Sequence, residues 1–211
     1  MKFIIENLET NAFKNLNLKI NTPGLYGVIG RNGAGKSTLF TAISGEMLYK
    51  GTIRFEDAKF FGRISYVPNL DIFDNNLTAN DYIKELKGEE YERAQKNMGI
   101  FQASNFFGKK IKKYSLGMKE ILAFIYSVSL QSDFIIVDEL MNGLDNTMRK
   151  EAFKILNELA KTKIILLTSH ILEEVEVNCS EIFFLSDTGF LSVNSLSEAK
   201  KLIFESDVFS N

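Results

Sequence analysis

The segment Gly30–Ser37 has the residue types and spacing of a phosphate-binding loop. It reads Gly-Arg-Asn-Gly-Ala-Gly-Lys-Ser, follows an apolar run and precedes a helical pattern, which fits G-x-x-x-x-G-K-[ST]. Its glycines let backbone N–H groups converge on phosphate oxygens, and the next helix adds a positive N-terminal dipole. We expect Lys36 to reach the β- and γ-phosphates and the Ser37 hydroxyl to ligate Mg²⁺. The residues expected to contact the nucleotide here are Asn32, Gly33, Ala34, Gly35, Lys36, Ser37 and Thr38.

Two carboxylates, Asp138 and Glu139, directly follow the wholly apolar run 134–137. The carboxyl edge of a buried parallel strand is where such sheets bind ligands. We expect Asp138 to hold Mg²⁺ through water and Glu139 to polarise the attacking water as a general base. A solvated acidic turn is the ordinary alternative, and the phosphate-binding loop earlier in the chain makes it the weaker one.

His170 and the segment Ser115–Met118 are ambiguous by themselves. His170, the only histidine, follows the apolar run 164–168 as the carboxylates follow 134–137. Ser115 and Gly117 open an apolar helix, where serine is a common N-cap, but such a helix start is also an anion site. Residue types and spacing leave a structural and a functional role open in both places.

The elements that position these residues alternate between strand and helix. Apolar runs without internal alternation, separated by amphipathic helices, indicate a parallel sheet buried on both faces, while Leu16–Ile20 alternates as a strand with one exposed face does. Residues 70–130 are instead helical and more polar. Strands are expected at about 25–29, 134–137, 164–168 and 182–185, and helices at about 36–44, 148–161 and 172–178.

We therefore expect one α/β domain over residues 1–211. In it, 1–69 and 131–211 form a mainly parallel core with an antiparallel β-subdomain, and 70–130 form an α-helical insertion that carries Ser115. A basic run inside the insertion is expected to be a solvated face; it comprises Lys109, Lys110, Lys112 and Lys113.

Composition narrows the classes of protein that the chain could be. Its 211 residues carry 25 Lys and Arg against 27 Asp and Glu, a net charge of −2, so binding to nucleic acid through a basic surface is not expected. The single cysteine excludes an internal disulfide and a cysteine-based zinc site. No run approaches the roughly 20 apolar residues of a membrane span, so we expect a cytoplasmic protein that reaches a membrane only through a partner.

The order of these motifs resembles the nucleotide-binding subunit of ATP-binding cassette (ABC) transporters, a P-loop NTPase with a RecA-like core. The resemblance covers essentially the whole chain and rests on Gly30–Thr38, Tyr114–Met118, Ile136–Glu139, Asn142–Asp145 and Thr168–His170. It implies that Ser115 and Gly117 contact the γ-phosphate of ATP bound to an opposing subunit. It likewise implies that Asp145 is the D-loop aspartate and His170 the switch histidine.

The same resemblance implies an ATPase that uses ATP and Mg²⁺ and has two kinds of protein partner. These are a second nucleotide-binding subunit, identical or different, and a separate membrane permease that would hold the pair at the inner face of the cell membrane. The sequences of 114–119 and 168–175 are similar to those of ABC-2 type exporters. This resemblance implies export of a peptide, antibiotic or other amphiphile.

Several positions depart from the family pattern. Asn69 stands where a glutamine would contact nucleotide and Mg²⁺, and asparagine is one methylene shorter. Leu140 replaces a proline, and Glu120 replaces a glutamine that often follows Gly-Met-Lys. For the aromatic residue expected to stack on adenine, only Phe13 and Phe3 are candidates, and both can equally be core residues.

Two other classes remain as alternatives. A non-transport ABC ATPase acting in translation or DNA maintenance would call for tandem cassettes or a long coiled-coil insertion, which this sequence lacks. A P-loop kinase or GTPase would leave Ser115–Met118, Asp145 and His170 without a role, and the sequence has no Asn-Lys-x-Asp for guanine.

Overall fold

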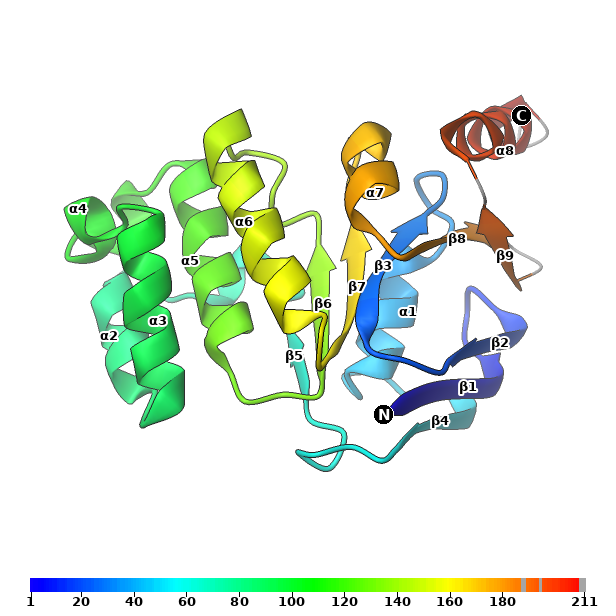
Figure 1. The fold of residues 1–211 in the computed structure, drawn as a ribbon, viewed down its shortest axis with the longest axis horizontal. Coiled ribbons are helices and arrows are strands. Elements are labelled where there is room, and N and C mark those ends of the chain that lie inside the picture. Colours follow the sequence, from blue (N-terminus) through cyan, green and yellow to red (C-terminus); the bar gives the residue numbers. More distant parts are fainter. Residues whose placement is uncertain (187–188, 194, 209–211) are drawn as a thin grey trace.

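The chain folds around a six-stranded sheet with the strand order β5-β6-β7-β3-β8-β9 (Figure 1). The computed structural model describes residues 1–186, 189–193 and 195–208. Neighbouring strands are parallel except β8 and β9, which are antiparallel. The predicted α/β class with a mainly parallel sheet is therefore confirmed. In spatial order the strands are β5 (Ile64–Tyr66), β6 (Phe134–Asp138), β7 (Ile164–Thr168), β3 (Gly24–Ile29), β8 (Glu181–Ser186) and β9 (Gly189–Val193).

In the three central strands, β6, β7 and β3, apolar and polar residues do not alternate, because both faces of these strands are covered. Every residue of β3 and β7, and the first four residues of β6, are buried, because apolar side chains cover both faces of the sheet. Along β6 and β7, alternate residues enter two different apolar clusters, one on each face. The register pairs Asp138 with Thr168, so the carboxyl ends of β6 and β7 lie side by side.

A second, antiparallel sheet has the order β2-β1-β4. Its strands are β2 (Lys14–Ile20), β1 (Lys2–Glu9) and β4 (Lys50–Glu56). Leu16, Leu18 and Ile20 are buried and the residues between them exposed, as the alternation predicted. The ring of Phe3 lies 4.6 Å from that of Phe134 in β6, which joins the small sheet to the core.

Outside the segment 70–130, the described part of the chain contains four helices beside the sheets. In Figure 1, α1 lies behind the sheet, while α6 and α7 lie in front of it. Helix α6 begins and ends about two residues before the predicted 148–161, and β9 and α8 lie beyond residue 185, where the sequence pattern predicted no element. The four helices are α1 (Lys36–Ile43), α6 (Asn146–Leu159), α7 (Leu172–Asn178) and α8 (Leu196–Val208).

Residues 70–130 are helical, and the basic run within them is exposed, as expected. This segment shares one apolar cluster with the face of the sheet that also contacts α6. The boundaries at 69 and 131 therefore mark a change of secondary structure within continuous packing, and their role as subdomain limits stays a prediction. The segment contains η1 (Leu70–Ile72), α2 (Ala79–Glu85), α3 (Glu89–Ile100), α4 (Ser104–Phe107), η2 (Ile111–Lys113) and α5 (Leu116–Ser129).

The direction of α5 matters for the site. Its N-terminal end and the carboxyl ends of β3, β6 and β7 lie on the same side of the molecule, the upper side in Figure 1, with α5 displaced laterally from β3. Within the described ranges, no helix is long and apolar enough to cross a membrane.

Candidate nucleotide-binding and catalytic site

The loop between β3 and α1 has a backbone that requires its glycines. Gly33 and Gly35 have φ values of 84° and 91°, in the left-handed region that glycine adopts without strain. A Cβ on Gly35 would also lie 2.6 Å from Cζ of Phe13. The turn between β1 and β2 therefore packs directly on the loop, and the loop leads straight into α1 at Lys36.

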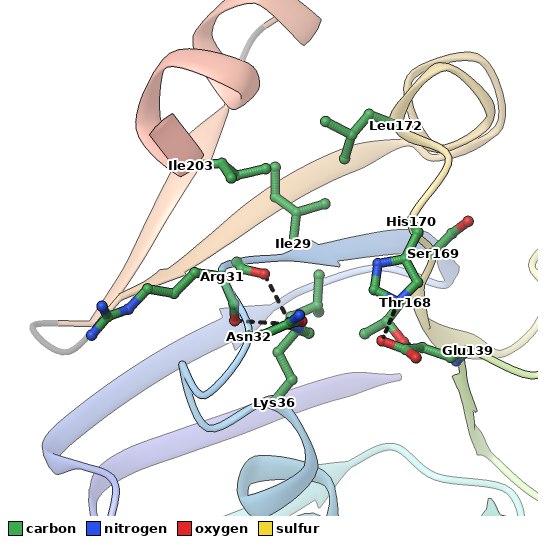
Figure 2. Close-up of a pocket in the computed structure, with 12 residues that line it drawn as sticks. Ile29, Arg31, Asn32, Lys36, Glu139, Thr168, Ser169, His170, Leu172 and Ile203 are labelled. Carbon is green, nitrogen blue, oxygen red and sulfur yellow. Dashed lines mark hydrogen bonds and ion pairs between the residues drawn. The ribbon is translucent and has the colours of Figure 1, made fainter. Parts of the chain in front are cut away.

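Lys36 lies at the centre of this loop. Its Nζ donates to the carbonyl oxygens of Gly30 at 2.9 Å and Arg31 at 3.1 Å (Figure 2). Burial lowers the pKa of Lys36, while Glu139 and Asp138 act in the opposite direction. The ammonium group is therefore a partly desolvated cation facing a loop of backbone amides, which suits an anionic phosphate.

Asp138 is the hub of a set of oxygen atoms at the end of β6. Its Oδ1 accepts from Thr168 Oγ1 at 2.7 Å, and its Oδ2 lies 3.5 Å from both Ser37 Oγ and Tyr66 Oη. Thr168 Oγ1 in turn accepts from the Glu139 N–H at 3.0 Å. Burial raises the pKa of Asp138, and the hydrogen bond from Thr168 opposes that shift.

The oxygen atoms around Asp138 are of the kind that bind Mg²⁺. Carboxylate and hydroxyl oxygens are hard ligands of the kind Mg²⁺ takes, and it usually keeps waters and binds substrate phosphates as well. The residues that the structure describes contain no cluster of three or more His, Cys, Asp or Glu side chains suited to a metal. The site therefore fits a Mg²⁺ ion held jointly by Ser37, Asp138 and a nucleotide, and does not resemble an all-protein metal cage.

Glu139 and His170 face each other across the edge of the sheet. Glu139 Oε1 lies 3.1 Å from His170 Nε2, and both side chains remain partly exposed (Figure 2). Glu139 has φ 56°, a conformation that costs energy for a residue with a side chain. Together with Gly30 and Lys36 they line a cavity of about 340 Å³.

The apolar rim of this cavity comes from three other elements. Ile29 ends β3, Leu172 opens α7, and Ile203 belongs to α8; all three line the cavity. In Figure 2 the side chain of Ile203 lies next to Ile29. The last described helix therefore contributes to the wall of the site, although the sequence pattern predicted no element there.

Ser115, Gly117 and Asp145 lie outside that cavity. Ser115 Oγ caps α5 by accepting from the Met118 N–H, and Asp145 Oδ1 caps α6 by accepting from the Met148 N–H at 2.8 Å. Leu116, between Ser115 and Gly117, is 63% exposed. One chain thus unites Lys36 with the residues after β6 and β7, and presents the Ser115 segment separately on the same side (Figure 1).

The side chain of Asn69 is engaged in a local cap. Its Oδ1 accepts from the Asp71 N–H at 2.9 Å and so caps η1. Ligation of Mg²⁺ or nucleotide by Asn69 therefore stays a prediction and would require this cap to open.

Neither aromatic candidate for stacking on adenine is accessible. Phe3 is fully buried and Phe13 is 2% exposed, both in the cluster between the two sheets. The spacing of these residues was equally compatible with core positions, and the structure places them there. Tyr49 instead lines a cavity of about 400 Å³ beside Thr10 and Asn11 in the β1–β2 turn.

Three further side chains contact the site or the loop beside it without having been predicted to do so: Thr168, Tyr66 and Glu120. Thr168 could have been found from its place at the carboxyl end of a buried strand, since it immediately precedes Ser169 and His170. Tyr66 and Glu120 carry no local signal, because each meets its partner through tertiary packing: Tyr66 at Asp138, and Glu120 at the Gly143 N–H.

Comparison with known proteins agrees with this geometry. Residues 13–142 match the ABC transporter family. The chain is 29% identical over 202 residues to the ABC transporter ATP-binding protein YxlF of Bacillus subtilis, covering 90% of this chain and 68% of that protein. It is 28% identical to YtrB of the same organism, covering 93% of this chain and 73% of YtrB. ABC transporter A family member 9 of Dictyostelium discoideum is 32% identical, but the chain spans only 26% of its length.

The fold is also that of solved ABC proteins. An ATP-binding subunit of an ABC transporter superimposes with a TM-score of 0.82 at 21% identity, over 99% of this chain and 98% of the other. The ADP conformation of MJ1267, an ATP-binding cassette of an ABC transporter, gives 0.72 at 19% identity, over 99% and 97%.

The chain therefore belongs to the ABC transporter family and is an ATP-binding domain of that family. It is an ATPase of the class that powers these transporters. The similarity to transporter proteins favours this assignment over an ATPase of translation or DNA maintenance.

Proposed function

We propose that this chain binds Mg-ATP at the loop Gly30–Ser37 and hydrolyses it within a dimer that drives a separate membrane permease. The observation that carries the proposal is the convergence of Lys36, Ser37, Asp138, Glu139 and His170 at one edge of the sheet. These groups come from elements widely separated in sequence: Lys36, Glu139 and His170 line the cavity, and Ser37 lies 3.5 Å from Asp138 beside it.

The residues divide the chemistry among themselves. The loop amides and Lys36 bind the phosphates and offset their negative charge. Ser37 and Asp138 hold Mg²⁺, which supplies Lewis-acid polarisation of the phosphates. Glu139 accepts a proton from the attacking water, and His170, in contact with Glu139, orients that carboxylate and faces the γ-phosphate.

The Ser115 segment supports a shared site. It begins α5, whose N-terminal dipole favours anions. This end of α5 lies on the same side of the molecule as the carboxyl end of β3 in Figure 1, and the segment lies outside its own chain's cavity. A second subunit turned by a two-fold axis would place Ser115 and Gly117 over the first subunit's nucleotide. Asp145, exposed at the start of α6, would lie in the same interface.

The permease and its cargo rest on the family resemblance. The similarity of 114–119 and 168–175 to ABC-2 type exporters supports export of a peptide, antibiotic or other amphiphile. Docking on that permease would hold the ATPase pair at the inner face of the cell membrane.

Light scattering of the Glu139→Gln protein tests the proposal. Mg-ATP should convert it from monomer to dimer, because nucleotide binding persists while turnover is blocked. Lys36→Ala in the same background is the control and should remain monomeric. A Glu139→Gln protein that binds ATP and stays monomeric at all concentrations would contradict a self-pairing subunit and point to a different partner chain.

A further inference from the structure

The loop Leu140–Asp145 connects the catalytic strand β6 to α6 and is held from two sides. Leu140, Met141 and Leu144 are buried and anchor it in the main apolar cluster. Asp145, at its end, is exposed. The buried side chains attach the loop to the apolar cluster. Hydrogen bonds with neighbouring helices then fix its backbone at Gly143 and Leu144.

The first contact comes from α5. Glu120, one turn after Ser115, is only 5% exposed, and its Oε2 accepts from the Gly143 N–H at 2.7 Å. Burial raises the pKa of Glu120, whereas the hydrogen bond from Gly143 lowers it. A buried carboxylate with a backbone donor at this distance is a strong, directional contact.

Two glycines bring the backbones close enough for that bond. A Cβ on Gly117 would lie 2.9 Å from the Gly143 oxygen, and a Cβ on Gly143 would lie 2.8 Å from Glu120 Oε2. The start of α5 and the loop are therefore in direct contact at Gly117 as well as through Glu120.

The second contact comes from α6 and α7. The Arg149 guanidinium donates to the Leu144 carbonyl and to Asn146 Oδ1, and its Nε lies 2.9 Å from Glu174 Oε1. Glu174 belongs to α7, the helix that follows His170. The end of the loop is thus tied to the helix next to the catalytic histidine.

We infer that Glu120 is a positioning residue, whose hydrogen bond with Gly143 holds the Asp145 loop and the Ser115 end of α5 in one fixed arrangement. Ser115 and Asp145 then meet the partner subunit as a single surface. Through Leu144 and Arg149 the same arrangement reaches α7 and His170. The inference rests on the proposed shared site, because the surface so held is the one that faces the partner's nucleotide.

Two substitutions separate the hydrogen bond from the packing. Glu120→Gln keeps an acceptor oxygen for the Gly143 N–H and removes only the charge. Glu120→Met keeps the length of the side chain and removes the acceptor, so a buried N–H loses its partner. Glu158→Ala is the matched control, since Glu158 is an exposed glutamate at the far end of α6 that pairs with Lys161.

The experiment measures three quantities on the full chain: hydrogen exchange of the Gly143 amide, the Kd for ATP, and kcat for ATP hydrolysis. In Glu120→Met we expect faster exchange at Gly143, a Kd within about twofold of wild type, and kcat reduced about tenfold or more. The separate variant Glu120→Gln should have a kcat within about threefold of wild type. Glu158→Ala should change neither the exchange at Gly143, nor the Kd, nor kcat. If Glu120→Met does not fold, Glu120→Ala takes its place.

Wild-type kcat in Glu120→Met, or equal loss in Glu120→Gln and Glu120→Met, would overturn the inference while leaving the proposed function intact. A loss of ATP binding together with kcat would show a general structural role and also overturn it. The proposed function itself would be refuted by two other results together: no ATP hydrolysis by the wild type, and no dimer of the Glu139→Gln protein with Mg-ATP.

Discussion

Lys36 and Glu139 lie in the same cavity but have opposite demands on their surroundings. Lys36 must stay charged although burial lowers its pKa, and the nearby carboxylates support that charge. In the proposed mechanism Glu139 accepts a proton from water, and its side chain is 40% exposed. The two side chains should therefore fail in different ways when they are changed.

Lys36→Ala should weaken ATP binding itself, because the loop loses its only side-chain ammonium. Glu139→Gln should leave binding within about twofold and lower kcat by about 10²–10⁴-fold, the usual contribution of a general base. Titration with a fluorescent ATP analogue and a phosphate-release assay separate the two. Unchanged affinity in Lys36→Ala, or full turnover in Glu139→Gln, would contradict the assigned roles.

Lys163 supplies a prediction about pH. Burial, with help from Arg93, lowers its pKa to about 8, so the folded chain releases this proton earlier than the unfolded chain. By linkage, the stability of the wild type rises with pH between 8 and the ordinary lysine pKa of 10.5. Below pH 8 the charged form is a penalty for the folded state.

Lys163→Met removes that penalty together with the hydrogen bonds that Lys163 Nζ donates to Ser132. Relative to the wild type, its Tm should therefore be highest near pH 7 and should fall by about 2–4 °C as pH rises from 8 to 10.5, because only the wild type gains stability in that range. Calorimetry at a series of pH values gives the result, and a difference that does not change with pH would contradict the assignment of the penalty to Lys163.

At the scale of elements, one buried carboxylate organises the connection between β4 and β5. Asp133 is 4% exposed, and its oxygens accept from the N–H groups of Lys59, Phe60 and Gly62 at 2.8, 2.8 and 3.0 Å. It lies at the amino end of β6, opposite to the nucleotide cavity. Its effect should therefore fall on stability and leave the chemistry unchanged.

Asp133→Ala leaves three backbone donors without this acceptor and should lower the free energy of unfolding by about 2–4 kcal/mol. Urea denaturation measures this change. The Kd for ATP of the folded variant should match that of the wild type. Glu181→Ala, a change at an exposed carboxylate on β8, is the control and should unfold like the wild type.

The sequence was most informative where local pattern and burial coincide. Unalternating apolar runs predicted β3, β6 and β7 closely, because strands covered on both faces need apolar residues throughout. Since carboxyl ends of parallel strands share one edge, the convergence of Lys36, Asp138 and His170 could also be predicted. The burial of Phe13 could not be predicted, because a core aromatic and a ligand-stacking aromatic have the same local pattern.

Contacts between distant segments carried no such signal. Glu120 contacts Gly143 only because α5 packs beside the loop after β6. The residues around Glu120 in the sequence are typical of any helix and do not indicate this contact. The last helix, α8, was not predicted because the first half of its sequence is mostly polar. Both features depend on tertiary packing, which periodicity along one segment does not report.

At the scale of the whole molecule, the proposed dimer would have each chain contribute one half to each of two sites. Lys36→Ala impairs the half that binds nucleotide, and Ser115→Arg impairs the half offered to the partner. Each variant alone should be inactive. A mixed dimer should contain one site with both defects and one intact site, because a two-fold axis exchanges the halves.

An equimolar mixture of the two variants should therefore recover about a quarter of wild-type ATPase activity if dimers form at random. Titrating one variant against the other gives the measurement, and activity should peak at equal amounts. A mixture as inactive as its components would show that each chain works with a complete site of its own.

The position of α8 has a practical consequence for handling the protein. Ile203 of this helix lines the nucleotide cavity, whereas β1 begins on the opposite, lower side of the molecule in Figure 1. A fluorophore or affinity tag attached after α8 should thus alter nucleotide exchange and subunit pairing. The same group attached ahead of Lys2 should leave both unchanged, which makes the amino terminus the better place for immobilisation in binding assays.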